Sequence, residues 1–196
     1  MAITVSVVIP TLGERPEMLA EAIASAKNQT VAPKEIIVEQ FPGRENPDNQ
    51  TMKINQGISK VTADAYVFMG DDDQLKPNFI ERMSAEMEKT GADIVSSFFD
   101  DFGDQVGAHG PNAFPLCSTI VKKSIWEKVG GFPLKAGPAS DALFYLLCLD
   151  AGAKWAKIGD SLYLSRVHKS AFSNTADWEL SKRRKRELFG HKYDGI

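Results

Sequence analysis

The stretch AYVFMGDDDQ, residues 65–74, places a short apolar run directly before three consecutive aspartates. An apolar run of this length that ends at a glycine predicts a strand buried within a sheet. Neighbouring carboxylates repel one another, so either a bound cation or a solvated turn must compensate their charge. The first alternative predicts a metal site at the end of the strand, and the second predicts only a turn.

Similar apolar runs recur through the first half of the chain and alternate with segments of helical periodicity. Strands are expected over residues 3–10, 34–40, 65–70 and 92–99, and helices after Pro16 and over residues 55–63, 78–91 and 142–150. Pro10 is expected to end the first strand. The alternation predicts an α/β fold with a mainly parallel, Rossmann-like sheet flanked by helices.

Size and composition are those of an ordinary soluble domain. The chain has 196 residues, of which 43% are apolar and 25% charged, and its formal net charge of −3 excludes a general binder of polyanions. No apolar run approaches the ~20 residues of a membrane span, and the N-terminus lacks the pattern of a signal peptide. Cys117 and Cys148 have neither metal-binding nor disulfide spacing, so a reduced, cytoplasmic protein is expected.

The aspartates lie where an α/β sheet binds its ligands, beyond the carboxyl ends of the strands. The loops after the first three strands carry PTLGER, EQFPGR and GDDDQ. Mg²⁺ and Mn²⁺ prefer oxygen ligands, take one or two carboxylates and leave positions for phosphate oxygens. The alternative of a turn or a helix cap requires only one aspartate.

Six segments, taken in order, resemble a GT-A glycosyltransferase of the family 2 type. They are VSVVIPT (5–11), RPEMLAEAI (15–23), EIIV (35–38), TADAYVFMGDDD (62–73), VGGF (129–132) and RVHKSAFS (166–173). The resemblance implies a GT-A fold and inverting, metal-dependent transfer of a sugar from a nucleoside-diphosphate sugar, with a UDP-sugar as the expected donor. It further implies one domain over 1–196, with a nucleotide-sugar half (1–99), an acceptor half (100–164) and a C-terminal segment (165–196).

The resemblance makes the triplet the DXD motif of the family. Asp71 and Asp73 map onto its acidic positions, so Asp73 would hold the metal and Asp71 would contact the ribose and the metal. Asp72 stays a candidate for the nucleotide sugar, because many members carry an aspartate where Gly70 stands. His168 resembles a histidine that completes the metal shell, so Asp71, Asp73 and His168 are the expected ligands of Mn²⁺ or Mg²⁺.

The expected nucleotide-sugar contacts come from several loops. They are Pro10, Thr11, Arg15, Glu39, Gln40, Asn55, Asp71, Asp72 and Arg166. Glu39 and Gln40 replace the aspartates that the family carries after the second strand, so the base of the nucleotide stays open. A solvated surface charge remains the alternative for Arg15, and a helix cap remains the alternative for Asn55.

Asp141 takes the position of the catalytic base in the resemblance, because it precedes Gly152 at the spacing of the family. Ser140 stands where the family has a glutamate, and a simple N-cap of the helix 142–150 remains an alternative for Asp141. The acceptor stays open among a glycan, a lipid-linked sugar, a protein and a modified nucleic-acid base. The rival function is a catalytically degenerate module that binds glycan or nucleic acid.

Two further segments invite a functional interpretation. Residues 107–115, with His109 and Phe114, either shape an acceptor pocket or form a connecting loop. The basic run KRRKR, residues 182–186, either forms a solvated helix or docks an anionic acceptor or membrane face.

Overall fold

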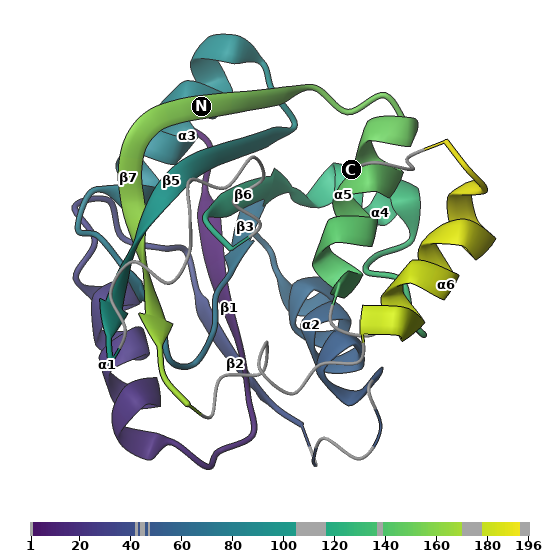
Figure 1. The fold of residues 1–196 in the computed structure, drawn as a ribbon. Helices are drawn as coiled ribbons and strands as arrows, with labels where there is room; N and C mark the ends of the chain where they lie inside the picture. Colours follow the sequence, from purple (N-terminus) through teal and green to yellow (C-terminus); the bar gives the residue numbers. More distant parts are fainter. Residues whose placement is uncertain are drawn as a thin grey trace.

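A sheet flanked by helices forms the centre of the computed structural model, which describes residues 2–41, 43, 46, 48–104, 117–136, 139–169 and 178–192 (Figure 1). The strands of this described part are β1 (Val5–Thr11), β2 (Ile36–Gln40), β3 (Ala65–Phe68), β4 (Gln74–Leu75), β5 (Ile94–Gly103), β6 (Thr119–Lys122) and β7 (Trp155–Val167). Its helices are α1 (Pro16–Lys27), α2 (Asp48–Lys60), α3 (Phe79–Thr90), α4 (Lys123–Val129), α5 (Ser140–Asp150) and α6 (Trp178–Phe189). No helix of the described part combines the length and the apolar character needed to cross a membrane.

The strands lie in the order β2-β1-β3-β6-β5-β7-β4. β1 pairs in parallel with β2 and β3, and β5 pairs in parallel with β7. β6 runs antiparallel to both of its neighbours, and β4 runs antiparallel to β7. The expected α/β fold is confirmed, and the carboxyl ends of β1, β2 and β3 share one edge of the sheet, at the bottom of Figure 1.

Two apolar layers cover the two faces of the sheet. Val5, Val7 and Ile9 of β1 belong to the layer that contains the apolar side chains of α1 and α3. Val8 points to the opposite layer, which contains those of α2, α4 and α5. Every residue of β1 is buried, so the continuous apolar run reflects a strand covered on both faces, as predicted.

β1 continues through Pro10 to Thr11, so the expected end of this strand at Pro10 is wrong. Pairing with β3 stops at Val8 and Phe68, whereas pairing with β2 continues to Thr11. Backbone groups of alternate residues point to opposite neighbours, and the position of the missing N–H at Pro10 faces the side that β3 has already left. The proline therefore removes no hydrogen bond from the ladder.

The helix expected over residues 55–63 also differs, because α2 begins earlier, at Asp48, and ends at Lys60. Its sequence is polar on average, and the apolar positions that mark a helix become dense only in its second half. α2 comes nearest to the sheet at Gly57, where an added Cβ would lie 2.6 Å from Cγ1 of Val8 and 3.1 Å from Cγ of Glu39. Only a residue without a side chain permits this approach.

We expect Gly57→Ala to lower the free energy of unfolding by about 1–3 kcal/mol, because the extra methyl group overpacks the contact of α2 with β1. The better helix propensity of alanine offsets only part of this cost. Gly159→Ala serves as the control, since a Cβ at Gly159 meets no atom within 4 Å. Urea denaturation of the three proteins measures the difference, and equal stability of Gly57→Ala and the parent would contradict the close approach.

Candidate active site

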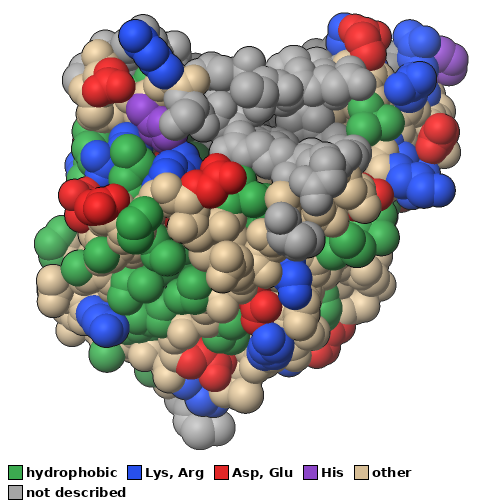
Figure 2. Space-filling model, turned by 90° about the horizontal axis from the view of Figure 1, so that it is seen from below, with side chains coloured by type: hydrophobic (Ala, Val, Ile, Leu, Met, Phe, Trp, Pro, Cys, Tyr) green, Lys and Arg blue, Asp and Glu red, His purple; other side chains and the backbone are tan. Residues whose placement is uncertain are grey.

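A small cavity opens at the edge of the sheet where β1, β2 and β3 end. Its volume is about 70 Å³, and its lining residues are Pro10, Leu12, Arg15, Phe41, Gln50, Gly70, Asp71 and Asp72. Four of the predicted nucleotide-sugar residues, namely Pro10, Arg15, Asp71 and Asp72, therefore lie together in this cavity. Figure 2 views the molecule from this side, and acidic, basic and histidine side chains gather on part of that face.

Arg15 connects the loop after β1 with the aspartate triplet. Its Nη2 lies 2.5 Å from Oδ1 of Asp71, and its Nη1 lies 2.5 Å from Oδ2 of Asp72. The same Nη1 lies 2.9 Å from Nε2 of His168. The side chain is only 18% exposed, so Arg15 is the counter-ion of the triplet and not a solvated surface charge.

Asp71 is buried and its carboxylate binds protein groups through both oxygens. The Thr11 hydroxyl donates to Oδ2 of Asp71 over 2.5 Å and accepts a hydrogen bond from the backbone N–H of Gly13 over 2.9 Å. Desolvation raises the pKa of Asp71, whereas the Thr11 hydroxyl and the charge of Arg15 lower it. Asp71 and Thr11 thus hold the loop that carries Arg15.

Asp73 turns away from Arg15 toward β7. Its carboxylate accepts hydrogen bonds from the Tyr163 hydroxyl over 2.7 Å and from the backbone N–H of Arg166 over 2.8 Å. Desolvation and the neighbouring charge of Asp72 raise the pKa of Asp73 to about 7, although these two hydrogen bonds lower it. Arg166 also donates from Nε to the backbone oxygen of Asp72 and pairs with Glu21.

Asp72 is the member of the triplet that lies beside the histidine. Its Oδ2 and Nε2 of the buried His168 are 2.9 Å apart, and both face Nη1 of Arg15. Of the expected ligands, Asp71 and His168 both contact Arg15, whereas Asp73 binds Tyr163 and the backbone of Arg166, so their shared role at a metal stays a prediction. Within the described ranges, no three His, Cys, Asp or Glu side chains converge as a metal site.

The pair of Asp72 and His168 nevertheless fits a divalent cation. Octahedral ligands at about 2.1 Å from a cation lie about 3 Å apart, which is close to the separation of these two atoms. A carboxylate and an imidazole suit Mn²⁺ or Mg²⁺ and leave other positions for phosphate oxygens and water. Both atoms already face a cation in this structure, the guanidinium of Arg15.

Asn55 and Glu39 both bind other parts of the protein, and their expected contacts with the nucleotide sugar stay a prediction. Glu39 is buried and pairs with Lys60, which ties β2 to α2. The side-chain amide of Asn55 binds both the N–H and the carbonyl of Phe132 over 2.8 Å, so it closes the turn at Gly131. Neither residue lines the cavity beside the triplet.

Gln40 reaches the loop after β1, where its Nε2 donates to the Leu12 carbonyl over 3.3 Å. Phe41 and Gln50 line the cavity, and sequence reasoning missed both. The position of Phe41 directly after Gln40 could have indicated it. Tyr163 was missed as well, and no signal marks it, because it lies within a mainly apolar strand. His109 and Phe114 lie outside the described residues.

Asp141 lies in the first turn of α5, where Ala139 is the N-cap, so Asp141 is not the cap of this helix. Its Oδ1 accepts a hydrogen bond from the N–H of Ala142 over 2.7 Å. Desolvation raises the pKa of Asp141 to about 6. Burial, and after it the negative charges of Asp73 and Asp141, raise the pKa of the Cys117 thiol.

Asp73 should make stability depend on pH. Its pKa in the folded protein, about 7, is above the ordinary value, so between about pH 4 and pH 7 the folded chain holds a proton that the unfolded chain releases. Stability should therefore fall as pH rises through this range. We expect Asp73→Asn to remove this component, and urea denaturation across the range measures it.

Asp104→Asn, which changes an exposed carboxylate just beyond β5, is the control for Asp73→Asn and should keep the pH profile of the parent. If Asp73→Asn instead loses stability with rising pH as steeply as the parent, the proton is not held at Asp73.

One sequence comparison matches part of the chain to a family model. Residues 44–135 of the 196-residue chain match the model described as glycosyl transferase family 2. The matched segment contains the aspartate triplet and the turn that Asn55 closes, and it excludes Arg15, Asp141 and His168. No curated protein matches this sequence.

Solved structures of TarS from S. aureus share the fold. TarS itself superimposes with a TM-score of 0.68 at 15% identity, covering 84% of this chain and 37% of TarS. TarS 1–349 in complex with UDP superimposes with a TM-score of 0.67 at 16% identity, covering 84% of this chain and 61% of the TarS fragment. TarS 1–349 in complex with UDP-GlcNAc superimposes with a TM-score of 0.69 at 14% identity, covering 97% of this chain and 74% of the TarS fragment. The chain thus spans little more than a third of TarS, and at these identities the likeness shows the fold alone.

Proposed function

We propose that this chain, as a GT-A glycosyltransferase of the family 2 type, transfers a sugar from a nucleoside-diphosphate sugar to an acceptor hydroxyl. The observation that carries the proposal is the placement of Asp72 and His168, with their facing atoms 2.9 Å apart, beside a cavity at the carboxyl ends of β1, β2 and β3. A fold of this kind binds its ligands at that edge.

The donor is expected to be a UDP-sugar. TarS, which shares the fold, has been solved with UDP and with UDP-GlcNAc. The cavity offers the ring of Pro10, the guanidinium of Arg15 and the backbone of Gly70 to such a molecule. The cationic side chain of Arg15 is suited to contact the diphosphate.

Asp72 and His168 would hold Mn²⁺ or Mg²⁺, and this choice differs from the sequence-based assignment of the metal to Asp73. When bound, the cation neutralises negative charge on the departing nucleoside diphosphate. The guanidinium of Arg15 would have to leave the place between Asp72 and His168, and the neighbouring cavity gives it the diphosphate as a new partner.

Asp141 acts as the general base in this proposal. Its raised pKa makes it a stronger base than an exposed aspartate while it stays ionised at neutral pH. Asp141 takes the proton of the acceptor hydroxyl as the oxygen bonds to the anomeric carbon. The bond from that carbon to the diphosphate oxygen breaks on the opposite face, which inverts the configuration without a covalent enzyme intermediate.

Asp141→Asn should keep donor affinity close to that of the parent and lower turnover by roughly 10²-fold or more. Turnover of the parent should rise with pH and level off above about pH 6, because only the ionised carboxylate accepts the proton. Asp150→Asn, at the other end of α5, is the control and should turn over normally. Calorimetric titration with UDP and an assay of UDP release measure the two effects.

Turnover of Asp141→Asn within a few-fold of the parent would place the base elsewhere. If the parent binds nucleotide sugars but releases no UDP from any of them, in water or with acceptors, the chain is a binding module and the proposed function fails.

Arg15 and a divalent cation should compete for one place. We expect Arg15→Met to bind Mn²⁺ about tenfold more tightly in the absence of nucleotide, since it removes a cation that occupies the space between two ligands. Asp72→Asn should abolish most Mn²⁺ binding, whereas Asp73→Asn should change it little. Electron paramagnetic resonance of free Mn²⁺ measures binding without any need for activity.

Arg82→Met is the control for Arg15→Met, because Arg82 pairs with Asp160 at the surface. Unchanged affinity for Mn²⁺ in Arg15→Met would show that the guanidinium and the metal do not share a site. If Asp73→Asn loses more affinity for Mn²⁺ than Asp72→Asn does, the metal is assigned to Asp73 again.

A further inference from the structure

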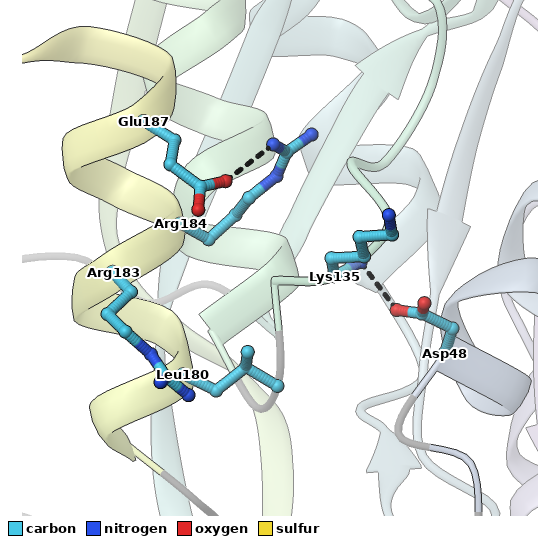
Figure 3. A pocket seen from close by; sticks show the side chains of 6 residues that line it. All are labelled: Asp48, Lys135, Leu180, Arg183, Arg184 and Glu187. Carbon is cyan, nitrogen blue, oxygen red and sulfur yellow. Dashed lines mark hydrogen bonds and ion pairs between the residues drawn. The ribbon is translucent and has the colours of Figure 1, made fainter.

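A second cavity, of about 310 Å³, lies between α6, the start of α2 and the turn that precedes α5. It is lined by Asp48, Lys135, Leu180, Arg183, Arg184 and Glu187, whose side chains are drawn in Figure 3. None of these residues lines the cavity beside the aspartate triplet. The donor site and the mechanism therefore leave this cavity without a role.

α6 is fixed against α5, which gives the cavity a defined wall. The Ser181 hydroxyl donates to the Ala136 carbonyl over 2.7 Å and accepts the N–H of Ala139 over 3.3 Å. Leu188 and Phe189 pack on an apolar cluster that includes Leu143 of α5. Helical spacing then directs a separate face of α6 toward the cavity, with Leu180, Arg183, Arg184 and Glu187.

The opposite wall presents Lys135 in an unusual backbone conformation. Its φ is +58°, the left-handed region that a residue with a side chain seldom adopts. The Asp48 carboxylate at the start of α2 accepts the N–H of Lys135 over 2.6 Å and holds this turn in place. Figure 3 shows the ends of the Lys135 and Arg184 side chains on facing walls of the cavity.

The cationic charge of the cavity is only partly compensated. Arg184 donates to the Leu134 carbonyl over 3.1 Å and pairs with Glu187 at 2.9 Å, so its position is fixed. The Asp48 carboxylate accepts a hydrogen bond from the backbone N–H of Lys135. In the part of the chain that the structure describes, no partner neutralises the ammonium group of Lys135 or the guanidinium of Arg183.

We propose that this cavity binds a phosphate group of an extended anionic acceptor, an inference that rests on the proposed function. Cations on two walls suit a tetrahedral phosphate, which accepts hydrogen bonds from several directions. Ser181 joins α6 to the segment 136–139, which leads directly to Asp141 at the start of α5. An acceptor chain held by the cations of this cavity would pass the turn that leads to α5, the helix that carries Asp141.

The acceptor must be longer than a single sugar. The cavity shares no lining residue with the donor cavity and does not include Asp141, so a molecule that uses both the phosphate site and the base spans the distance between them. A phosphate site in this cavity would use particular residues, and it therefore differs from a general attraction of anions by the whole basic run 182–186. Lys182 and Arg186 of the same run do not line the cavity.

The test compares variants that each remove one positive charge, at Lys135 in the turn before α5 and at Arg183 and Arg186 on α6. Short-chain inorganic polyphosphate is titrated into the full chain by calorimetry at about 20 mM and about 150 mM salt. Lys135→Gln and Arg183→Gln should each weaken binding by about fivefold, as expected from the loss of one partly screened charge-assisted contact. Arg186→Gln, the matched control at an exposed position outside the cavity, should change binding less than twofold.

Equal losses in Arg183→Gln and Arg186→Gln would overturn the proposal in favour of a diffuse electrostatic field. Equally tight binding of polygalacturonate with the same variant dependence would overturn the choice of phosphate over carboxylate. Binding to phosphatidylglycerol vesicles but not to polyphosphate would make the surface a membrane contact. UDP release from UDP-GlcNAc by the unaltered chain tests the proposed function separately, because it needs no acceptor.

Discussion

Repulsion among three adjacent carboxylates constrains the structure more than any other single feature. Each carboxylate of the triplet has a different set of partners, with Arg15 shared by Asp71 and Asp72, and the partners come from distant parts of the chain. Thr11 and Arg15 bind Asp71, Arg15 and His168 lie at Asp72, and Tyr163 with the backbone of Arg166 binds Asp73. The end of β3 is thereby tied to the loop after β1 and to β7, across the breadth of the sheet.

The same compensation shapes the chemistry of the site. Arg15 supplies positive charge to Asp71 and Asp72, so the folded chain itself compensates part of the charge of its acidic cluster. The ionised form of Asp73 is unfavourable in the folded protein, since desolvation and the charge of Asp72 raise the pKa of its carboxyl to about 7. Functional sites commonly keep such unfavourable groups because the surrounding structure compensates for them.

The region around Asp141 is organised by helices rather than by strands. α5 carries Asp141 at its start, and α6 packs its apolar side chains on α5 while turning a charged face to a cavity. Both faces of α6 follow from the helical period, because one stretch of sequence places apolar side chains on α5 and charged side chains at the cavity.

The sequence by itself determined the order of strands and helices in the first half of the chain. Continuous apolar runs such as 3–10 are long enough for buried strands, and helices between parallel strands force the loops after β1, β2 and β3 to one edge. The triplet had to lie at that edge, because it follows β3 directly. The resemblance of short segments to family 2 glycosyltransferases has the same local origin, and the family model matches one part of the chain, residues 44–135.

Tertiary structure alone decided which aspartate faces the histidine. Side chains in a turn after a strand follow no fixed period, and His168 lies 96 residues beyond Asp72, so only the folded chain selects Asp72 over Asp73. Only the tertiary structure shows that Asn55 binds Phe132 and that Glu39 pairs with Lys60, since the sequence of a helix or strand does not specify which elements pack against it. The sequence of the basic run 182–186 does not distinguish its members. Only the packing of α6 on α5 shows that Arg183 and Arg184 line the cavity and that Arg186 does not.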